Sequence, residues 1–155
     1  GHVVVMRPNG RPCGCGRAGC LETYCSATGV ARTAREILST SDAPTILRDI
    51  PIDQIESKDV SIAASKGDDV AKSIMDFTGR LLGTACADFA CFNSPEAFIF
   101  FGGLTKAGDL IMDPIRKGYE ENILKCYKGK AKMLVSQLDD AKAAVLGASA
   151  LGWEL

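Results

Sequence analysis

The feature that most constrains this chain is a short stretch, residues 2–22, which carries the only histidine and three of the seven cysteines. Its potential metal ligands are His2, Cys13, Cys15 and Cys20. Zinc prefers four nitrogen and sulfur ligands in a tetrahedron, and one histidine with three cysteines provides such a set. Four glycines in the stretch let the backbone turn tightly enough for closely spaced cysteines to reach one ion. The sequence therefore predicts a structural zinc site that pins this loop.

A β-hairpin is expected to bring His2 back toward the cysteines. The three consecutive valines at 3–5 are typical of a strand, and the Pro-Asn-Gly sequence at 8–10 is typical of a turn. Together these features predict a hairpin between the histidine and the first cysteine.

The alternative interpretation is a set of buried or disulfide-bonded cysteines beside a surface histidine. Seven is an odd number of cysteines, and nothing in the sequence marks the chain as secreted. One intervening residue also makes a bond between Cys13 and Cys15 difficult. The remaining cysteines lie in apolar patterns and are expected to be core thiols: Cys25, Cys86, Cys91 and Cys126. A reduced, cytoplasmic protein is the favoured interpretation.

Size and charge narrow the class of protein. With 155 residues the chain is long enough for one domain with a substantial core. Its 18 basic and 19 acidic side chains give a net charge of −1, which argues against a basic nucleic-acid-binding surface. No apolar run is long enough to span a bilayer. Because the chain begins one residue before a potential metal ligand, we expect it to be a fragment.

Helices and strands are expected to alternate after the loop, as in an α/β protein. Helical periodicity predicts helices over residues 21–38, 57–67, 68–92 and 106–124, and a last helix that starts at Asp139 or Asp140. Residues 97–101 are expected to form a buried strand, and residues 130–138 a second strand. The predicted core stripe of the 68–92 helix consists of Val70, Ile74, Phe77, Leu81, Ala85 and Phe89.

Residues 1–22 closely resemble the signature of the ROK family of sugar kinases and sugar-responsive repressors. That signature is Gly-His, a short hairpin, then Cys-x-Cys-Gly-x-x-Gly-Cys-x-Glu, and every position is present. The resemblance implies that His2, Cys13, Cys15 and Cys20 hold zinc, and that His2 and Glu22 reach sugar hydroxyls beside it. A carboxylate accepts two hydroxyl hydrogen bonds, which suits such a ligand. The residues alone leave open that Glu22 only stabilises a helix N-terminus.

A glycine pair, Gly102-Gly103, follows the predicted strand and precedes a helix. This layout lets a ligand approach the backbone, although many α/β connections look alike. The family resemblance implies a contact between Gly102, Gly103 and Leu104 and the adenosine of ATP. Leu104 stands where a third glycine is frequent in the family.

The resemblance implies that residues 1–138 form the C-terminal lobe of an actin-like ATPase (ribonuclease H-like) fold, with the zinc motif at 2–20. This α/β lobe would be incomplete without an N-terminal part, on which the helix in residues 139–155 is expected to pack. The stripe for that packing is Ala141, Ala144, Val145, Ala148 and Leu151. The family's Asp-x-Gly-x-Thr phosphate loop does not occur. We assign no catalytic residue, because three aspartates in helical patterns lack a matching context: Asp88, Asp109 and Asp113.

The function implied by the resemblance is that of an ATP-dependent hexose kinase, glucokinase-like, with structural zinc and with ATP and Mg as co-substrate. Its expected partners are a sugar, ATP and a second copy of the chain, with no membrane and no nucleic acid through this segment. The segment alone is expected to be inactive. The alternatives are a sugar-responsive transcriptional repressor with an upstream winged helix, and a non-catalytic zinc-stabilised interaction module.

Overall fold

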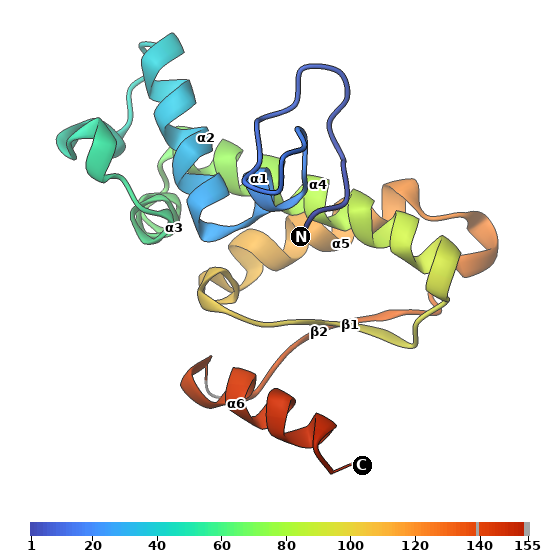
Figure 1. The fold of residues 1–155 in the computed structure, drawn as a ribbon. Coiled ribbons are helices and arrows are strands. Elements are labelled where there is room, and N and C mark those ends of the chain that lie inside the picture. The colour runs from blue at the N-terminus through green and yellow to red at the C-terminus, as the bar shows by residue number, and fades with distance from the viewer. Residues whose placement is uncertain (139, 154–155) are drawn as a thin grey trace.

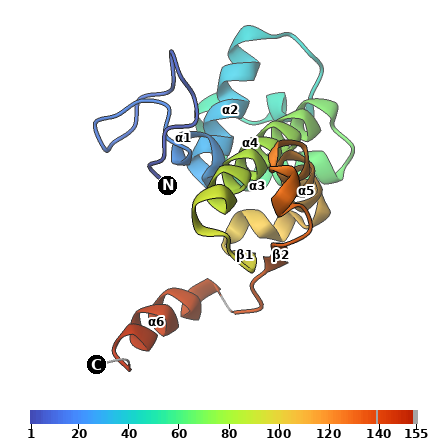
Figure 2. The same ribbon diagram turned by 90° about the vertical axis from the view of Figure 1, so that its right-hand side faces the viewer.

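The computed structural model describes residues 1–138 and 140–153, and of residues 140–144 it describes the backbone alone. An N-terminal loop leads into a layer of helices, which lies on a small parallel sheet, and a last helix extends away from this body (Figures 1 and 2). The helices are α1 Glu22–Cys25, α2 Ala27–Thr40, α3 Ser57–Ser65, α4 Asp69–Asn93, α5 Asp109–Asn122 and α6 Asp140–Leu151. The strands are β1 Ala97–Phe100 and β2 Lys132–Val135.

The centre of the fold is the close packing of α4 against α5. A Cβ atom at Gly83 would lie 2.1 Å from the carbonyl oxygen of Ile115, and one at Gly118 would lie 2.3 Å from that of Arg80. Glycine at these sites therefore lets the two backbones approach each other. The main core forms between these helices and their neighbours α2 and α3 from Val30, Ala34, Leu47, Ile55, Val60, Ala63, Ala64, Ala71, Ile74, Met75, Ile111, Met112 and Ile115.

The long helix predicted over 68–92 is confirmed, but its predicted stripe is buried only in part: Ile74 and Ala85 are buried, and Phe77 is exposed. Asp68 caps α4 by accepting a hydrogen bond from the Ala71 N–H at 2.9 Å. Phe77 is 37% exposed, whereas Thr78 and Gly79 beside it are buried. The prediction counted large apolar side chains, but α5 packs on the face of α4 where small residues admit its backbone.

The helix predicted over 21–38 is two helices. Ser26 adopts an extended conformation that ends α1, and its side chain accepts a hydrogen bond from the Gly29 N–H to cap α2. Gly29, expected to weaken one continuous helix, instead packs against Tyr24: a Cβ atom there would lie 2.7 Å from the Tyr24 carbonyl carbon. The break turns the chain so that α1 and α2 both face the N-terminal loop.

No regular strand forms at residues 3–5. Val4 makes an isolated antiparallel bridge with Cys20, and Pro12 makes another with Ala18. The N-terminal residues therefore pair with the segment around Cys20. The predicted hairpin, which would close before Cys13, does not form. Gly19 has φ +79°, so the extended backbone that a regular strand needs is interrupted beside the bridge.

The strand predicted over 97–101 is present, but it is buried on one side only. β1 and β2 run parallel, with Ala97 opposite Lys132 and Phe100 opposite Val135. Phe98, Phe100 and Met133 pack against the helices, whereas Ile99 is 67% exposed. In the described part of the chain, helices cover one face of this sheet.

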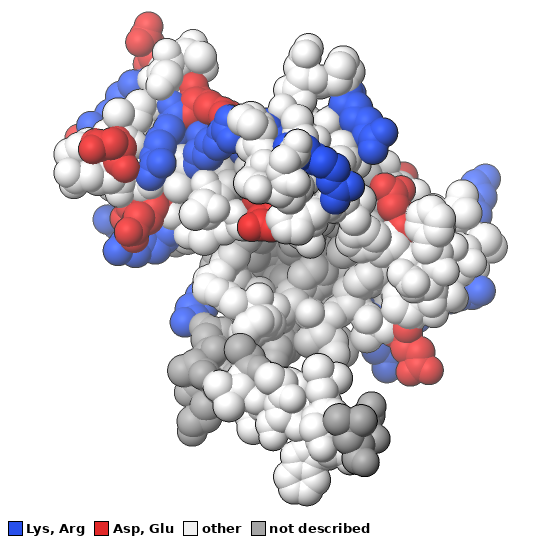
Figure 3. Space-filling view, in the orientation of Figure 1, with Lys and Arg blue, Asp and Glu red and all other residues white. Residues whose placement is uncertain are grey.

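The C-terminal part of the molecule is apolar and open. In the view of Figure 3, charged side chains gather over the helical layer, while the described surface of α6, residues 145–151, carries none. Val145 and Leu151, from the predicted stripe, are 69% and 72% exposed. The side chains of Ala141 and Ala144 lie outside the described residues, as does Asp139. None of the described helices is long and apolar enough to cross a membrane.

All seven cysteines are free, and two of the four predicted core thiols are not in the core. Cys86 is buried and Cys25 is half-buried, but Cys91 and Cys126 are exposed. Cys91 lies near the C-terminal end of α4, on a side that α5 does not cover, and Cys126 lies in a short 3₁₀ helix, Lys125–Tyr127.

A candidate metal centre beside a carboxylate

The structure brings together the four potential metal ligands predicted from the sequence. One ligand atom from each of His2, Cys13, Cys15 and Cys20 lies within 4.8 Å of the others. The Sγ atoms of Cys15 and Cys20 are 3.6 Å apart, and His2 Nδ1 lies 3.5 Å from Cys13 Sγ. Tetrahedral zinc with ordinary bond lengths would separate two sulfurs by about 3.8 Å, and sulfur and nitrogen by about 3.6 Å. These residues therefore fit a zinc ion.

Backbone contacts position the ligands. The Gly19 N–H donates to the Arg11 carbonyl and the Cys13 N–H donates to the Arg17 carbonyl, both at 2.8 Å. Gly19 has φ +79°, and a Cβ atom there would lie 2.1 Å from the Met6 carbonyl oxygen. Only glycine permits both this conformation and this approach. The loop is therefore a tightly closed structure although it contains no regular strand.

The local environment shifts the pKa values of two of the thiols in opposite directions. The hydrogen bond from the Arg17 backbone N–H outweighs desolvation and lowers the pKa of Cys15 to about 6. Burial raises the pKa of Cys20 to about 11, and the neighbouring Cys15 and Cys13 add to the shift. Zinc binds the thiolate form. Cys15 thus offers a thiolate at neutral pH, and Cys20 must lose its proton when a metal binds.

Glu22 lies next to the metal ligands, at the start of α1. Its Oε2 is 3.4 Å from His2 Nε2, and both side chains are half-exposed. The two ring nitrogens of His2 thus face different groups, Nδ1 toward the cysteines and Nε2 toward the carboxylate. A histidine that ligates metal through Nδ1 carries its proton on Nε2, and such histidines commonly donate that proton to a carboxylate. The Arg17 guanidinium fixes the backbone of this histidine by donating a hydrogen bond to the His2 carbonyl at 2.7 Å.

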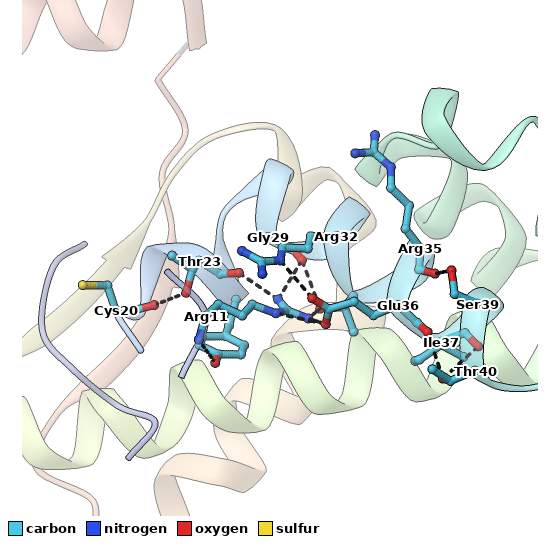
Figure 4. Close-up of polar contacts among 12 residues, drawn as sticks. Arg11, Cys20, Thr23, Gly29, Arg32, Arg35, Glu36, Ile37, Ser39 and Thr40 are labelled. Atoms are coloured by element: carbon cyan, nitrogen blue, oxygen red, sulfur yellow. Dashed lines mark hydrogen bonds and ion pairs between the residues drawn. The ribbon is translucent and has the colours of Figure 1, made fainter. Parts of the chain in front are cut away.

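One important residue of the site was missed in the sequence. The Arg11 side chain is buried and extends from the metal-binding loop to α2 (Figure 4). It makes five hydrogen bonds, as many as a guanidinium has N–H groups. The acceptors are the carbonyl oxygens of Thr23 and Gly29, Thr33 Oγ1, and Glu36 Oε2, which accepts two. Its partners lie 12 to 25 residues away along the chain, so no local pattern predicts them. The one signal in the sequence is an arginine within a glycine-rich loop.

The glycine pair predicted to contact a nucleotide lies elsewhere in the fold. In Figure 1 the N-terminal loop lies above α4, and the strands lie below α5. Gly102 follows β1 with φ +110°, and Cβ atoms at Gly102 and Gly103 would meet nothing within 4 Å. Leu104 packs against the main core within a 3₁₀ helix, Gly103–Ala107, so its side chain leaves the backbone of the pair accessible.

The three aspartates that lie in helical patterns, Asp88, Asp109 and Asp113, have ordinary surroundings. Asp109 and Asp113 both accept from Arg116 Nη1, at 3.5 and 2.7 Å. Asp88 is exposed on α4. Their positions on helix surfaces agree with a structural role.

The fold and the site together define an α/β protein with a Cys₃His cluster beside a carboxylate. The chain matches the ROK family over residues 1–154. It therefore belongs to the ROK family, as the motif at residues 1–22 indicated.

Similar proteins include both enzymes and regulators. A glucokinase of Halalkalibacterium halodurans is 36% identical over 99% of this chain, which covers 46% of that protein. A ROK family glucokinase from Streptomyces griseus, solved in complex with glucose and AMPPNP, is 37% identical, with a TM-score of 0.83 over 97% of this chain and 49% of that one. A ROK family transcriptional regulator, a homologue of the E. coli MLC protein, is 28% identical, with a TM-score of 0.82 over 97% of this chain and 37% of that one. The chain spans about half the length of the curated relatives it matches.

Proposed function

We propose that this chain is the C-terminal half of an ATP-dependent hexose kinase of the glucokinase type. The observation that carries the proposal is the arrangement of His2, whose Nδ1 faces the cysteine cluster while its Nε2 lies 3.4 Å from Glu22 Oε2. This arrangement belongs to a chain that is 36% identical to a glucokinase. A fixed imidazole beside an accessible carboxylate suits a polyol, because it offers a donor and an acceptor side by side.

In this proposal Glu22 accepts hydrogen bonds from two sugar hydroxyls. The His2 Nε2–H, which faces Glu22 at 3.4 Å in the structure, donates to a sugar oxygen when the sugar is bound. Zinc, held by His2, Cys13, Cys15 and Cys20, supplies a rigid support that fixes the orientation of the imidazole. Because the carboxylate and the imidazole are both half-exposed, a ligand has access to them. The sugar is therefore bound by groups whose positions the loop sets before it arrives.

The second substrate in this proposal is ATP with Mg. Gly102, Gly103 and Leu104 contact its adenosine, since the open backbone of the glycine pair leaves room for a flat ring. Phosphoryl transfer further needs groups that position the phosphates and accept the hydroxyl proton. We assign no catalytic base to this chain. Residues 1–138 form one lobe of the enzyme, the helix in residues 139–155 docks on the other lobe, and the enzyme is a homodimer in the cytoplasm.

A sugar-responsive repressor is the second candidate function. The observation that favours it is the likeness to a ROK family transcriptional regulator, which matches the fold about as well as the glucokinase does. The kinase ranks first because its sequence identity is higher, 37% against 28%.

The test is ATP-dependent phosphorylation of glucose by the full-length protein, measured as ADP formation. Glu22→Gln should weaken sugar binding about 10- to 100-fold while zinc content stays the same, because the amide keeps the shape but loses the charge of the acceptor. Glu56→Gln is the matched control, since Glu56 pairs with Lys58 on the surface. Unchanged sugar affinity in Glu22→Gln would contradict the assignment. Sugar-dependent DNA binding without phosphorylation would establish the repressor, and sugars that leave the melting temperature unchanged would favour a non-catalytic module.

A further inference from the structure

An ion pair between the buried Arg11 and the half-exposed Glu36 joins the metal-binding loop, residues 2–20, to the helical layer. The Arg11 residue is 8% exposed, its guanidinium carbon lies 4.4 Å from the centre of the Tyr24 ring, and two of its N–H groups donate to Glu36. A buried arginine is tolerated only where its charge and its donors are all matched. This one is fully matched by acceptors from α1 and α2.

The backbone of the same residue is bonded to the ligands and to α1. The Arg11 N–H donates to Tyr24 Oη at 2.9 Å, and the Arg11 carbonyl accepts from Gly19, the neighbour of the ligand Cys20. Cys13 lies two residues further along the chain. Tyr24 belongs to the single turn of helix α1 that carries Glu22. One residue therefore connects two metal ligands with the helix that presents the carboxylate.

A neighbouring arginine provides an internal comparison. Arg32 Nε donates to Glu36 Oε1 at 2.9 Å, within α2 and on the surface. It binds the same carboxylate, but it does not link the loop to the helix. Surface pairs at this spacing contribute little.

We propose that Arg11 and Glu36 are a positioning pair, which holds the metal-binding loop against α2 so that His2, the cysteines and Glu22 keep their relative places. This inference rests on the zinc and sugar site proposed above and extends it to two residues that touch neither ligand. Loss of the pair frees the loop to move relative to α1. The site then holds zinc less firmly and meets the sugar with its groups misplaced.

The experiment compares Arg11→Lys, Glu36→Gln and Arg32→Lys in the full-length zinc-loaded protein. The rate of zinc transfer to a chromogenic chelator is measured first, and the KM for sugar and kcat second. We expect zinc transfer to be about tenfold faster in the first two variants, as for other residues that support metal ligands. The KM for sugar should rise with kcat nearly unchanged, and Arg32→Lys should match the parent. Ile74→Val, which removes a methyl group from the core on α4, shows how general destabilisation alone affects zinc transfer and the KM for sugar.

The outcomes separate this inference from the proposed function. Faster zinc transfer in Glu36→Gln but not in Arg32→Lys or Ile74→Val supports the pair, even in a protein that phosphorylates no sugar. Parental rates in both Arg11→Lys and Glu36→Gln overturn it, whatever the enzyme activity. If Arg11→Lys does not fold, Glu36→Gln decides alone, because its half-exposed side chain is replaceable. A protein that binds no zinc at all overturns both the metal site and this inference.

Discussion

The two ends of the chain differ in composition and in packing, and in each the packing is the opposite of what the composition suggests. Residues 1–22 are rich in glycine and polar groups, yet they form a closed loop in which four ligand atoms lie within 4.8 Å. Residues 97–153 contain apolar strands and a helix, yet Ile99, Val145 and Leu151 are all more than two-thirds exposed. Order in the first region comes from close backbone contacts and a matched buried charge. In the second region α5 and the inner face of the sheet are covered, but the outer face of the sheet and the apolar side chains of α6 have no covering surface within the described residues.

This difference shows that burial depends on a partner and not on the apolar character of a segment. A strand or helix with an apolar face lowers its free energy only when another surface removes that face from water. The N-terminal loop carries its partners with it, because Gly10, Arg11 and Gly19 contact residues of the loop itself and of the adjoining helices. We propose that the C-terminal face of the molecule receives its partner from the other lobe of the enzyme.

The largest expected effect is the loss of the metal. Cys15→Ser should reduce zinc content from about one ion per chain to less than about half, because serine is a poor zinc ligand. Stability against unfolding in the presence of zinc should fall by about 5 kcal/mol or more, since metal binding and folding of such loops are linked. Elemental analysis and chemical denaturation measure the two. Cys91→Ser, at an exposed free cysteine, is the matched control, and equal zinc in both variants would remove Cys15 from the ligand set.

The next effect tests the close backbone contacts of the loop. Gly19→Ala should cost about 3 kcal/mol, because it adds a clash with the Met6 carbonyl to the strain of a positive φ. Gly16→Ala is the matched control: Gly16 has φ +84°, but its Cβ atom would meet nothing within 4 Å, so it should cost about 1 kcal/mol. Urea denaturation measures both free energies. Equal losses would show that close approach is not what orders this loop.

A smaller effect concerns the charge of Glu36. Burial opposes its ionisation, but hydrogen bonds from Arg11 and Arg32 outweigh this and lower the pKa below the ordinary 4.5. The ionised carboxylate therefore contributes stability that is complete above pH 4.5 and is lost as pH falls through the lowered value. Glu36→Gln should lose less than about 1 kcal/mol at pH 7, because water screens the half-exposed group. Its deficit should shrink on acidification, measured with excess chelator so that zinc release does not contribute. If the stability difference between Glu36→Gln and the parent did not change with pH, the charge of Glu36 would not be what stabilises the protein.

The smallest effect is expected at the open end of the chain. Replacing both Val145 and Leu151 with serine should change the stability of this chain by less than about 0.5 kcal/mol, since both are exposed. The same two changes at the buried Val30 and Leu47 are the matched control and should cost more than about 4 kcal/mol. In the full-length protein the α6 changes should cost about 2–4 kcal/mol. Equal losses in the chain and in the full-length protein would show that α6 packs within this chain.

The sequence by itself determined the ligand cluster, the family and most helix positions. The cluster was predictable because ligand identity and spacing are local, and zinc accepts few combinations. The long helix α4 was predictable because its cap at Asp68 and its apolar periodicity lie within one segment. Glu22 was placed next to His2 by the family motif, and the structure brings the two side chains to 3.4 Å.

The tertiary structure decided what depends on distant partners. It broke the predicted 21–38 helix at Ser26, because Gly29 and Tyr24 pack together there. It added small residues of α4 such as Gly79 and Gly83 to the buried face, because α5 approaches through them, and it left Phe77 and Ile99 exposed. It also joined Arg11 to Glu36 across 25 residues. Such contacts follow from which surfaces meet in space, and periodicity along the chain carries no information about that.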